Sequence, residues 1–291
     1  MFRKDFIWGA ASSAYQIEGA AFEDGRGLSI WDVYAAQEGK VYENHTGEVS
    51  CDHYHRFRED VALMKQMGIK AYRFSISWPR ILPEGIGAVN QRGIDFYNAL
   101  IDELLAHDIE PFITLYHWDL PYALYQKGGW LNRDIVDWFA EYAKVVSEHF
   151  SDRVKKFFTL NEPQCFIGLG FLNGAHAPGL KLPLKDTFLM AHHALMAHGS
   201  AVIALRKYAK APIEVGYAPT AGMTYPASES KEDIEAARSA LFSMEVEPDN
   251  WTWNVAWFSD PVFLGHYPEE GLKRFAAYLP KILPEDMELI A

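Results

Sequence analysis

One pattern repeats along the chain and constrains its fold: an amphipathic helix, a short turn, and a compact apolar strand that ends in polar or aromatic residues. Val61, Met64 and Met67 lie on one helical face, and the apolar run 71–77 follows soon after Gly68. Alternating helices and strands imply parallel pairing and an α/β fold. The other predicted strands are Phe112–Tyr116, Phe157–Leu160, Ile213–Tyr217 and one within Phe6–Tyr15.

The polar residues of these segments gather at the carboxyl ends of the predicted strands. Parallel strands that are buried on both faces read as nearly continuous apolar runs, and barrels and open sheets both place their active sites at the carboxyl ends. Gly168, Gly170 and Gly174 lack the spacing of a dinucleotide-binding loop, so a (β/α)8 barrel is favoured. We expect a single domain over 1–291, with long loops at 44–55, 173–185 and 223–253.

Composition excludes several classes of partner. The chain is 49% apolar, which favours a globular protein, and its net charge of -12 disfavours nucleic acid and anionic membrane surfaces. We expect no membrane-spanning segment, because no stretch approaches about 20 consecutive apolar residues. Cys51 and Cys165 lie far apart, so neither a disulfide framework nor a zinc spacing is indicated, and a reducing, cytoplasmic location is favoured. The amino-terminal residues lack the apolar stretch of a signal peptide.

Glu162 and His117 are the first candidates for chemistry. In the alignment that places Phe112 beside Phe157, these two residues occupy the same step beyond the carboxyl ends of their strands. A glutamate between an apolar strand and Pro163 is costly to bury and needs a purpose or a partner. From position alone, catalysis and a buried ion pair remain open for Glu162, and a hydrogen-bonded structural histidine is the commoner outcome for His117.

Histidines suggest a metal site as a rival interpretation. Two groups are candidates: one is His53 with His55, and the other is His192, His193 and His198. The second group lacks an acidic ligand at a helical spacing of three or four residues, so metal catalysis is disfavoured. We expect neither a metal nor another cofactor.

Several longer motifs carry a resemblance to a known family. Taken together and in this order, they resemble glycoside hydrolase family one, the β-glucosidase family, and they extend over essentially the whole chain. The resemblance implies a (β/α)8 TIM barrel of which this sequence contains strands one to five with their helices. The motifs are the segments Phe6–Gly19, Tyr72–Arg80, Leu115–Pro121, Thr159–Pro163 and Asp260–Pro268.

The resemblance assigns catalytic roles to Glu162 and Arg73 and a substrate-binding role to Asn161. It implies that Glu162 is the acid/base of a retaining, double-displacement mechanism and that Asn161 hydrogen-bonds the sugar 2-OH. It also implies that Arg73 hydrogen-bonds the nucleophile carboxylate and keeps it ionised and aimed. Ordinary hydrogen bonding inside the core remains the alternative role for Arg73.

Three further residues match the family's sugar-binding positions. Gln16 and His117 match residues that hold the 3-OH and 4-OH side of the sugar, and Trp118 matches a residue that lines the pocket. An amide suits this role because it both donates to and accepts from a vicinal diol. Core hydrogen bonding for Gln16 and core packing for Trp118 are the alternatives.

The family's nucleophile lies in a Thr-Glu-Asn-Gly motif, which does not occur in this sequence. We therefore expect that a carboxy-terminal remainder of the barrel, from the same gene or a second chain, completes the site, and that the 291 residues alone do not turn over a glycoside. The expected substrates are small β-glucosides or oligosaccharides such as cellobiose. A 6-phospho-β-glucosidase and a non-catalytic sugar-binding fragment remain the alternatives.

Overall fold

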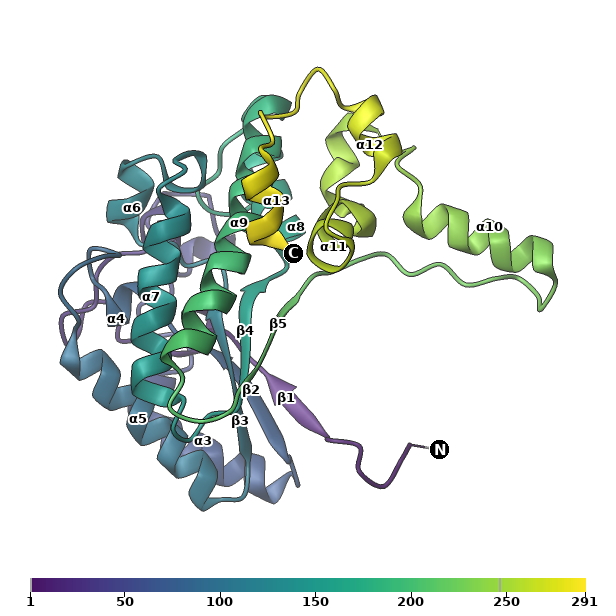
Figure 1. Ribbon diagram of the computed structural model, residues 1–291. Helices are drawn as coiled ribbons and strands as arrows, with labels where there is room; N and C mark the ends of the chain where they lie inside the picture. Colours follow the sequence, from purple (N-terminus) through teal and green to yellow (C-terminus); the bar gives the residue numbers. More distant parts are fainter. Residues whose placement is uncertain (1, 246) are drawn as a thin grey trace. The chain divides into compact units, whose positions relative to one another are not determined.

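The computed structural model describes residues 2–245 and 247–291, which contain one five-stranded sheet (Figure 1). The strands stand side by side in chain order, and the three pairs from β1 to β4 are parallel. Neighbouring parallel strands need crossover connections, and helices lie between the strands in the chain, so the predicted α/β fold is confirmed. The strands are β1 (Gly9–Ala11), β2 (Ala71–Ser75), β3 (Glu110–Tyr116), β4 (Lys156–Asn161) and β5 (Glu214–Ala218).

The chain divides by its internal contacts into two compact units. Unit 1 comprises residues 1–129, 137–161 and 201–217, and unit 2 comprises residues 130–136, 162–200 and 218–291. The sheet belongs to unit 1, apart from the last residue of β5. The expectation of a single domain over 1–291 stays a prediction.

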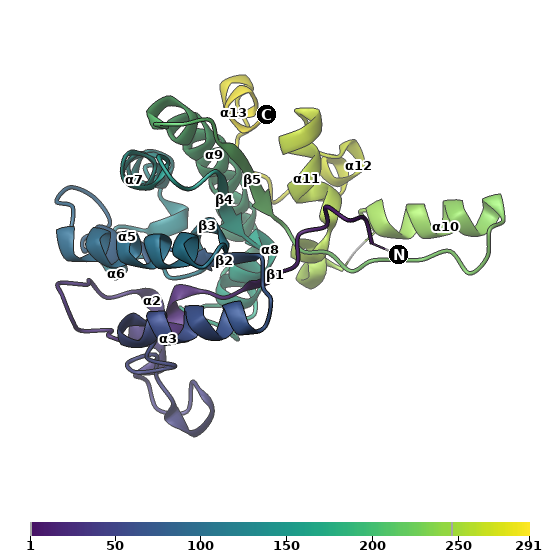
Figure 2. The same ribbon diagram turned by 90° about the horizontal axis from the view of Figure 1, so that it is seen from below.

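Helices cover one face of the sheet in unit 1, where α3, α5 and α7 follow the strands in order (Figure 2). Trp78, which is fully buried, stacks on Tyr142 of α7 with ring centroids 4.9 Å apart. Aromatic burial of this kind is a large part of what holds helices on a sheet. The helices are α1 (Ala14–Ile17), α2 (Ile30–Ala35), η1 (Tyr42–Asn44), α3 (His53–Gln66), α4 (Trp78–Ile81), α5 (Gln91–Ala106), α6 (Tyr122–Gln126), η2 (Gly129–Leu131) and α7 (Ile135–Phe150).

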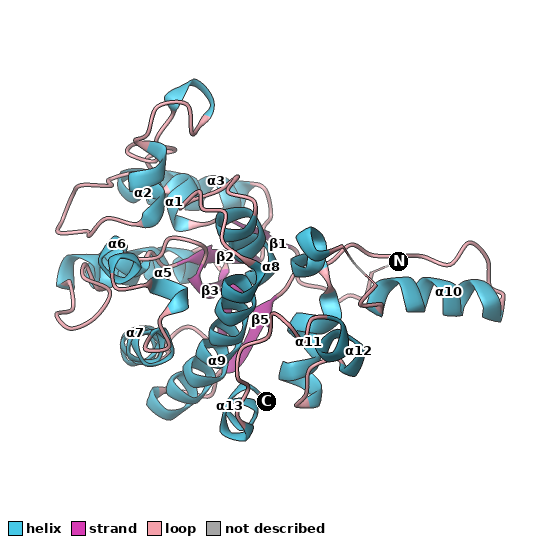
Figure 3. Cartoon of the chain, turned by 90° about the horizontal axis from the view of Figure 1, so that it is seen from above, coloured by secondary structure: helices cyan, strands magenta, loops and turns pink. Residues whose placement is uncertain are grey.

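Unit 2 is mainly helical (Figure 3). Its core is aromatic: Phe188 stacks on Trp251 at 3.9 Å between ring centroids and meets Trp257 edge-on at 5.1 Å. The elements that begin in this part of the chain are α8 (Pro163–Ile167), η3 (Gly168–Leu172), α9 (Leu184–Tyr208), α10 (Lys231–Phe242), η4 (Pro248–Trp253), α11 (Val255–Leu264), α12 (Glu269–Arg274) and α13 (Pro284–Ile290).

Helix α9 is long and apolar enough to cross a membrane by length and composition. It has 25 residues, and 78% of its most apolar window is buried inside the protein. A mostly buried core helix of a globular protein passes the same test, so α9 is weak evidence for a membrane span.

Two sequence predictions differ from the structure. The predicted loop 223–253 contains α10, which begins after Ser230 with the serine side chain accepting from Asp233 N at 3.1 Å. None of its residues is buried, although Ile234, Ala237 and Leu241 recur at a helical spacing that the loop prediction overlooked. In addition, Phe112 pairs with Lys156 and not with Phe157. Both strands are largely apolar on both faces, so hydrophobic pattern cannot distinguish registers one residue apart.

Candidate active site

Arg73 lies within β2, and its side chain reaches residues of β3 and of β4, the next strand but one. Its Nε donates to Thr114 Oγ1 at 2.8 Å, and its Nη2 donates to Asn161 Oδ1 at 2.7 Å. The guanidinium carbon also lies 4.8 Å from the centroid of the Phe158 ring. A planar guanidinium held by two hydrogen bonds and an aromatic face has a defined orientation.

Asn161 ends β4, is buried, and connects Arg73 to His117. Arginine only donates, so the oxygen of the Asn161 amide must face it, and this fixes the amide orientation. The amide nitrogen Nδ2 then faces His117 Nε2 at 3.3 Å. With Nε2 accepting that bond, the proton of the neutral imidazole lies on Nδ1.

His117 is neutral at physiological pH. Burial, followed by the charge of Arg73, lowers the pKa of its imidazole from 6.5 to about 4. The corrected register explains its contact with Asn161, because the pairing of Tyr116 with Leu160 makes His117 and Asn161 the next residues of the two strands. A neutral imidazole both donates and accepts hydrogen bonds, as recognition of a hydroxyl requires.

Trp118 adopts a backbone conformation that non-glycine residues seldom use. Its φ is 79°, and its indole Nε1 donates to the Asn161 carbonyl oxygen at 2.9 Å. The indole ring lies 5.1 Å from the His117 ring, measured between centroids. Such backbone strain persists where surrounding contacts determine it, and it clusters at functional sites.

Glu162 follows Asn161 directly and also has a left-handed backbone, with φ 46° and ψ 69°. Its N–H donates to the Ala218 carbonyl at 2.8 Å, and its carbonyl accepts from Cys165 N at 2.9 Å. The residue precedes the first turn of α8, with Pro163 at the first helical position. The Glu162 side chain is half-buried, so it has contact with both protein and solvent.

Cys165 contacts the carboxylate of Glu162, which the sequence interpretation missed. The thiol is buried, and burial together with hydrogen bonding to Glu162 raises its pKa to about 12. It therefore stays protonated, and its S–H donates weakly to the carboxylate. The signal was available in the sequence, because residues three apart at the start of a helix face the same side.

Gln16 lies in α1, five residues beyond the end of β1, and its side chain is exposed. The neighbouring strands are aligned, since Ala11 pairs with Arg73. The structure thus brings four of the predicted residues into one hydrogen-bonded cluster, with Glu162 joined to it through the chain. Gln16 lies on an adjacent segment, outside that set of bonds. The cluster consists of Arg73, His117, Trp118 and Asn161.

The histidines of the rival metal interpretation have hydrogen-bond partners. His53 Nδ1 lies 2.6 Å from Asp60 Oδ2, and His55 Nδ1 lies 2.6 Å from Asp52 Oδ1. His192 contacts a tyrosine and an aspartate, and His193 contacts a backbone carbonyl. Within residues 2–245 and 247–291, no group of three His, Cys, Asp or Glu side chains is arranged to hold a metal ion. The absence of a metal cofactor stays a prediction.

One arginine, a neutral histidine, an indole and an amide thus lie together among the strands of a parallel sheet, next in the chain to a glutamate. The family model described as Glycosyl hydrolase family 1 matches residues 1–291, and the chain belongs to this family. It is 48% identical over 289 residues to a 1,4-β-D-glucan glucohydrolase of Thermotoga neapolitana, covering 99% of this chain and 65% of the relative. It is 44% identical over 296 residues to an aryl-phospho-β-D-glucosidase of Bacillus subtilis, covering 100% of this chain and 59% of the relative.

A solved structure supports the same assignment. The β-glucosidase from Thermotoga maritima in complex with glucoimidazole superposes with a TM-score of 0.88 at 47% identity, covering 99% of this chain and 63% of that one. The five-stranded sheet is therefore part of the predicted (β/α)8 barrel. The chain spans less than two thirds of the length of these relatives. The roles of the six site residues stay predictions.

Proposed function

We propose that this chain provides the sugar-binding and acid/base part of a retaining β-glucosidase that hydrolyses terminal β-D-glucosyl residues. The observation that carries the proposal is the hydrogen-bonded series Arg73–Asn161–His117, whose middle member, Asn161, directly precedes Glu162. A buried polar series of this kind is costly unless it is satisfied, and it holds its members in one arrangement. Such preorganisation favours catalysis, because the groups need not reorganise when the substrate binds.

Asn161 retains hydrogen-bonding capacity after its two side-chain bonds. An amide has two N–H donors and two acceptor lone pairs, and Arg73 and His117 each engage one of these. One N–H and one lone pair are left for a sugar hydroxyl. This is the capacity needed for the 2-OH contact, which strengthens as positive charge develops on the sugar ring.

Glu162 acts as the acid/base. It protonates the leaving glycosidic oxygen while a second carboxylate, about 5 to 5.5 Å away, attacks the anomeric carbon. It then removes a proton from the water that hydrolyses the glycosyl-enzyme. In the family resemblance the second carboxylate comes from a motif that these 291 residues do not contain, so the remainder of the barrel would supply it.

The substrates we propose are aryl β-glucosides and short oligosaccharides such as cellobiose. The names of the Thermotoga relatives support an unphosphorylated sugar, and the name of the Bacillus subtilis relative supports a phosphorylated one, for which we propose the 6-phosphate. Comparing kcat/KM for an aryl β-glucoside and its 6-phosphate distinguishes the two. Cys51 and Cys165 are both free thiols, which supports a reducing, cytoplasmic location.

Replacing Glu162 in the full-length gene product tests the assignment. For Glu162→Ala we expect kcat on substrates with poor leaving groups to fall by about 10²–10⁴. Activated aryl glucosides should lose much less, because their leaving groups need little protonation. Azide should restore turnover and yield a glucosyl azide, since it attacks the intermediate without base assistance.

Glu229→Ala, which removes an exposed carboxyl group, is the matched control and should leave turnover unchanged. Equal loss on every substrate without azide rescue would show that Glu162 is structural. Binding of glucoimidazole by wild-type protein that hydrolyses no glycoside would instead establish a sugar-binding protein.

A further inference from the structure

A buried polar network lies within unit 1, outside the cluster described above. Glu18 Oε2 accepts from Arg80 Nε at 2.9 Å, and Glu18 Oε1 accepts from the Tyr97 hydroxyl at 2.6 Å. The Tyr97 hydroxyl accepts from Ser77 N at 2.7 Å. The side chains of Arg80 and Glu18 are 1% and 6% exposed, so this ion pair is almost completely removed from water.

A second buried ion pair belongs to the same region. Arg26 Nη1 donates to Asp32 Oδ2 at 2.9 Å, with side chains 4% and 5% exposed. Asp32 also accepts from Ser29 N at 2.6 Å, as part of the capping box that begins α2. Each of these two guanidinium groups therefore has a carboxylate of its own.

Asp119 adds a third carboxyl group without adding a cation. The residue is completely buried, and among the residues that the structure describes neither of its carboxyl oxygens has a well-aligned hydrogen bond. The hydroxyl of Ser77 faces it and likewise has no other direct partner. Three buried carboxyl groups thus share two guanidinium groups, and Asp119 is the unpaired one.

Burial favours the protonated form of Asp119. It is the main reason that the pKa of this carboxyl is raised to about 7; the charge of Arg26 opposes the rise, the charge of Glu18 adds to it, and hydrogen bonding to Ser77 opposes it. Burial raises the pKa of Tyr142, which packs in the same core, and a negative charge on Asp119 raises it further. Arg26 and Arg80 are engaged by Asp32 and Glu18, so neither forms an ion pair with Asp119.

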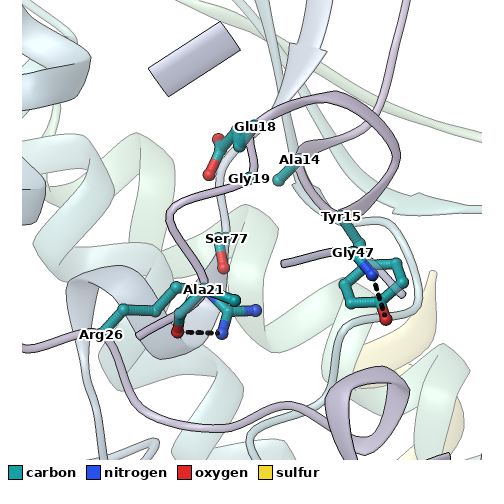
Figure 4. Close-up of a pocket in the computed structure, with 8 residues that line it drawn as sticks. All are labelled: Ala14, Tyr15, Glu18, Gly19, Ala21, Arg26, Gly47 and Ser77. Carbon is teal, nitrogen blue, oxygen red and sulfur yellow. Dashed lines mark hydrogen bonds between the residues drawn. The ribbon is translucent and has the colours of Figure 1, made fainter. Parts of the chain in front are cut away.

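A small cavity lies beside Ser77, between Glu18 and Arg26 (Figure 4). Its volume is about 10 Å³, which is room for a single water molecule and no more. The figure shows Arg26 bonded to the Ala21 carbonyl and Tyr15 bonded to Gly47 N across this space. Ser77, which lines this cavity, is also the side chain whose hydroxyl faces Asp119.

Both ends of the network adjoin predicted sugar contacts. Asp119 follows His117 and Trp118 directly, and Glu18 lies two residues after Gln16. Trp118 has the strained φ of 79° and is held on one side by its bond to the Asn161 carbonyl. Immediately beyond Asp119, the Leu120 carbonyl accepts from Ile30 N and Tyr122 N donates to the Leu28 carbonyl, which holds the other side of the turn.

We propose that Asp119 is a positioning residue: its buried carboxyl group, which faces the Ser77 hydroxyl, holds the turn that presents His117 and Trp118 to the sugar. The protonated carboxyl donates its O–H to Ser77 Oγ and places no charge in the core. Ionisation puts an unpaired negative charge beside Glu18, which the turn relieves by moving toward water. The sugar part of this role rests on the proposed function, whereas the effect on the turn does not.

Hydrogen exchange of the Trp118 indole N–H tests the effect on the turn without any sugar. The signal is assigned with Trp118→Phe, and its protection is expressed relative to free tryptophan at the same pH. In wild-type protein we expect protection to fall by a factor of about three or more between about pH 5 and about pH 8.5. Asp119→Asn, whose amide can donate to Ser77 at every pH, should keep high protection throughout. Asp119→Ala should show low protection at both values.

Two further variants make the test decisive. Ser77→Ala removes the partner with little change in volume and should lower protection as Asp119→Ala does, so a misfolded alanine variant at position 119 does not block the experiment. Asp108→Asn makes the same chemical change at an exposed position before β3 and should behave as wild type. Protection that is independent of pH in wild type, or unchanged in both alanine variants, overturns the proposal.

Steady-state kinetics on the full-length gene product tests the positioning role. In wild type we expect KM for an aryl β-glucoside to rise as the pH increases through about 7, with kcat changed less. In Asp119→Asn this rise in KM should be absent. Altered indole protection without altered KM overturns the link to the sugar. A wild-type protein that binds no glycoside overturns the proposed function, while the exchange data still decide whether Asp119 holds the turn.

Discussion

Replacing Arg73 with methionine should raise the pKa of His117 by a limited amount that the structure sets. The pKa of this imidazole is lowered from 6.5 to about 4, with burial as the larger cause and the charge of Arg73 as the smaller. Removing the charge should therefore recover less than half of that difference, leaving the pKa below the midpoint of the two values. Arg73→Lys keeps the positive charge but not the planar fork, so its His117 should titrate near the wild-type pKa.

The measurement is an NMR pH titration of the imidazole, assigned with His117→Asn. Arg92→Met, which removes an exposed arginine paired with Asp24, is the control and should leave the titration unchanged. A pKa that returned to about 6.5 in Arg73→Met would refute the reasoning, because it would make charge and not burial the main cause. An unchanged pKa would refute it as well, since Arg73 would then exert no field on the ring.

Two further predictions concern stability and are measured by urea denaturation. Arg80→Met or Glu18→Gln alone should lower the free energy of unfolding by about 3–5 kcal/mol, because each leaves a buried group unpaired. The double variant should lower it by less than the sum of the two single losses, and additive losses would contradict a buried pair. Gly199→Ala in α9 should lower the free energy of unfolding by about 1–3 kcal/mol, although alanine has the better helix propensity. The reason is that the alanine Cβ would lie 1.8 Å from the Leu289 carbonyl oxygen. Gly216→Ala, where the Cβ meets open space, is the control, and equal effects at both positions would contradict the close packing of α9 and α13.

The order of elements could be predicted from the sequence because each strand carries its own local signal. The apolar runs that end β3 and β4 are compact, and each is preceded by a helix with a clear apolar face. The same local signal could not set the register, since a slip of one residue leaves these buried strands equally apolar on both faces. The consequence is chemical: the structure aligns His117 with Asn161, and this alignment creates the bond that fixes the imidazole tautomer.

Individual site residues were predictable to the extent that their motifs are contiguous. Asn161, Glu162 and His117 each adjoin a strand end, where position alone marks a polar residue for attention. The contact of Cys165 with Glu162 escaped notice because the apolar character of a cysteine fits core packing equally well. The effect of Glu162 on the pKa of the Cys165 thiol appears once the helical turn places the sulfur and the carboxylate together.

Asp119 could not be identified from sequence for a different physical reason. Within the segment 115–121 it is one more acidic residue, and an acid after an aromatic pair is equally compatible with an exposed turn. Its character depends on the balance between carboxyl and guanidinium groups contributed by segments far apart in the chain, namely Glu18, Arg26 and Arg80. Motifs thus indicate which side chains face the substrate, whereas the groups that hold those side chains in place are set by charges that only the fold brings together.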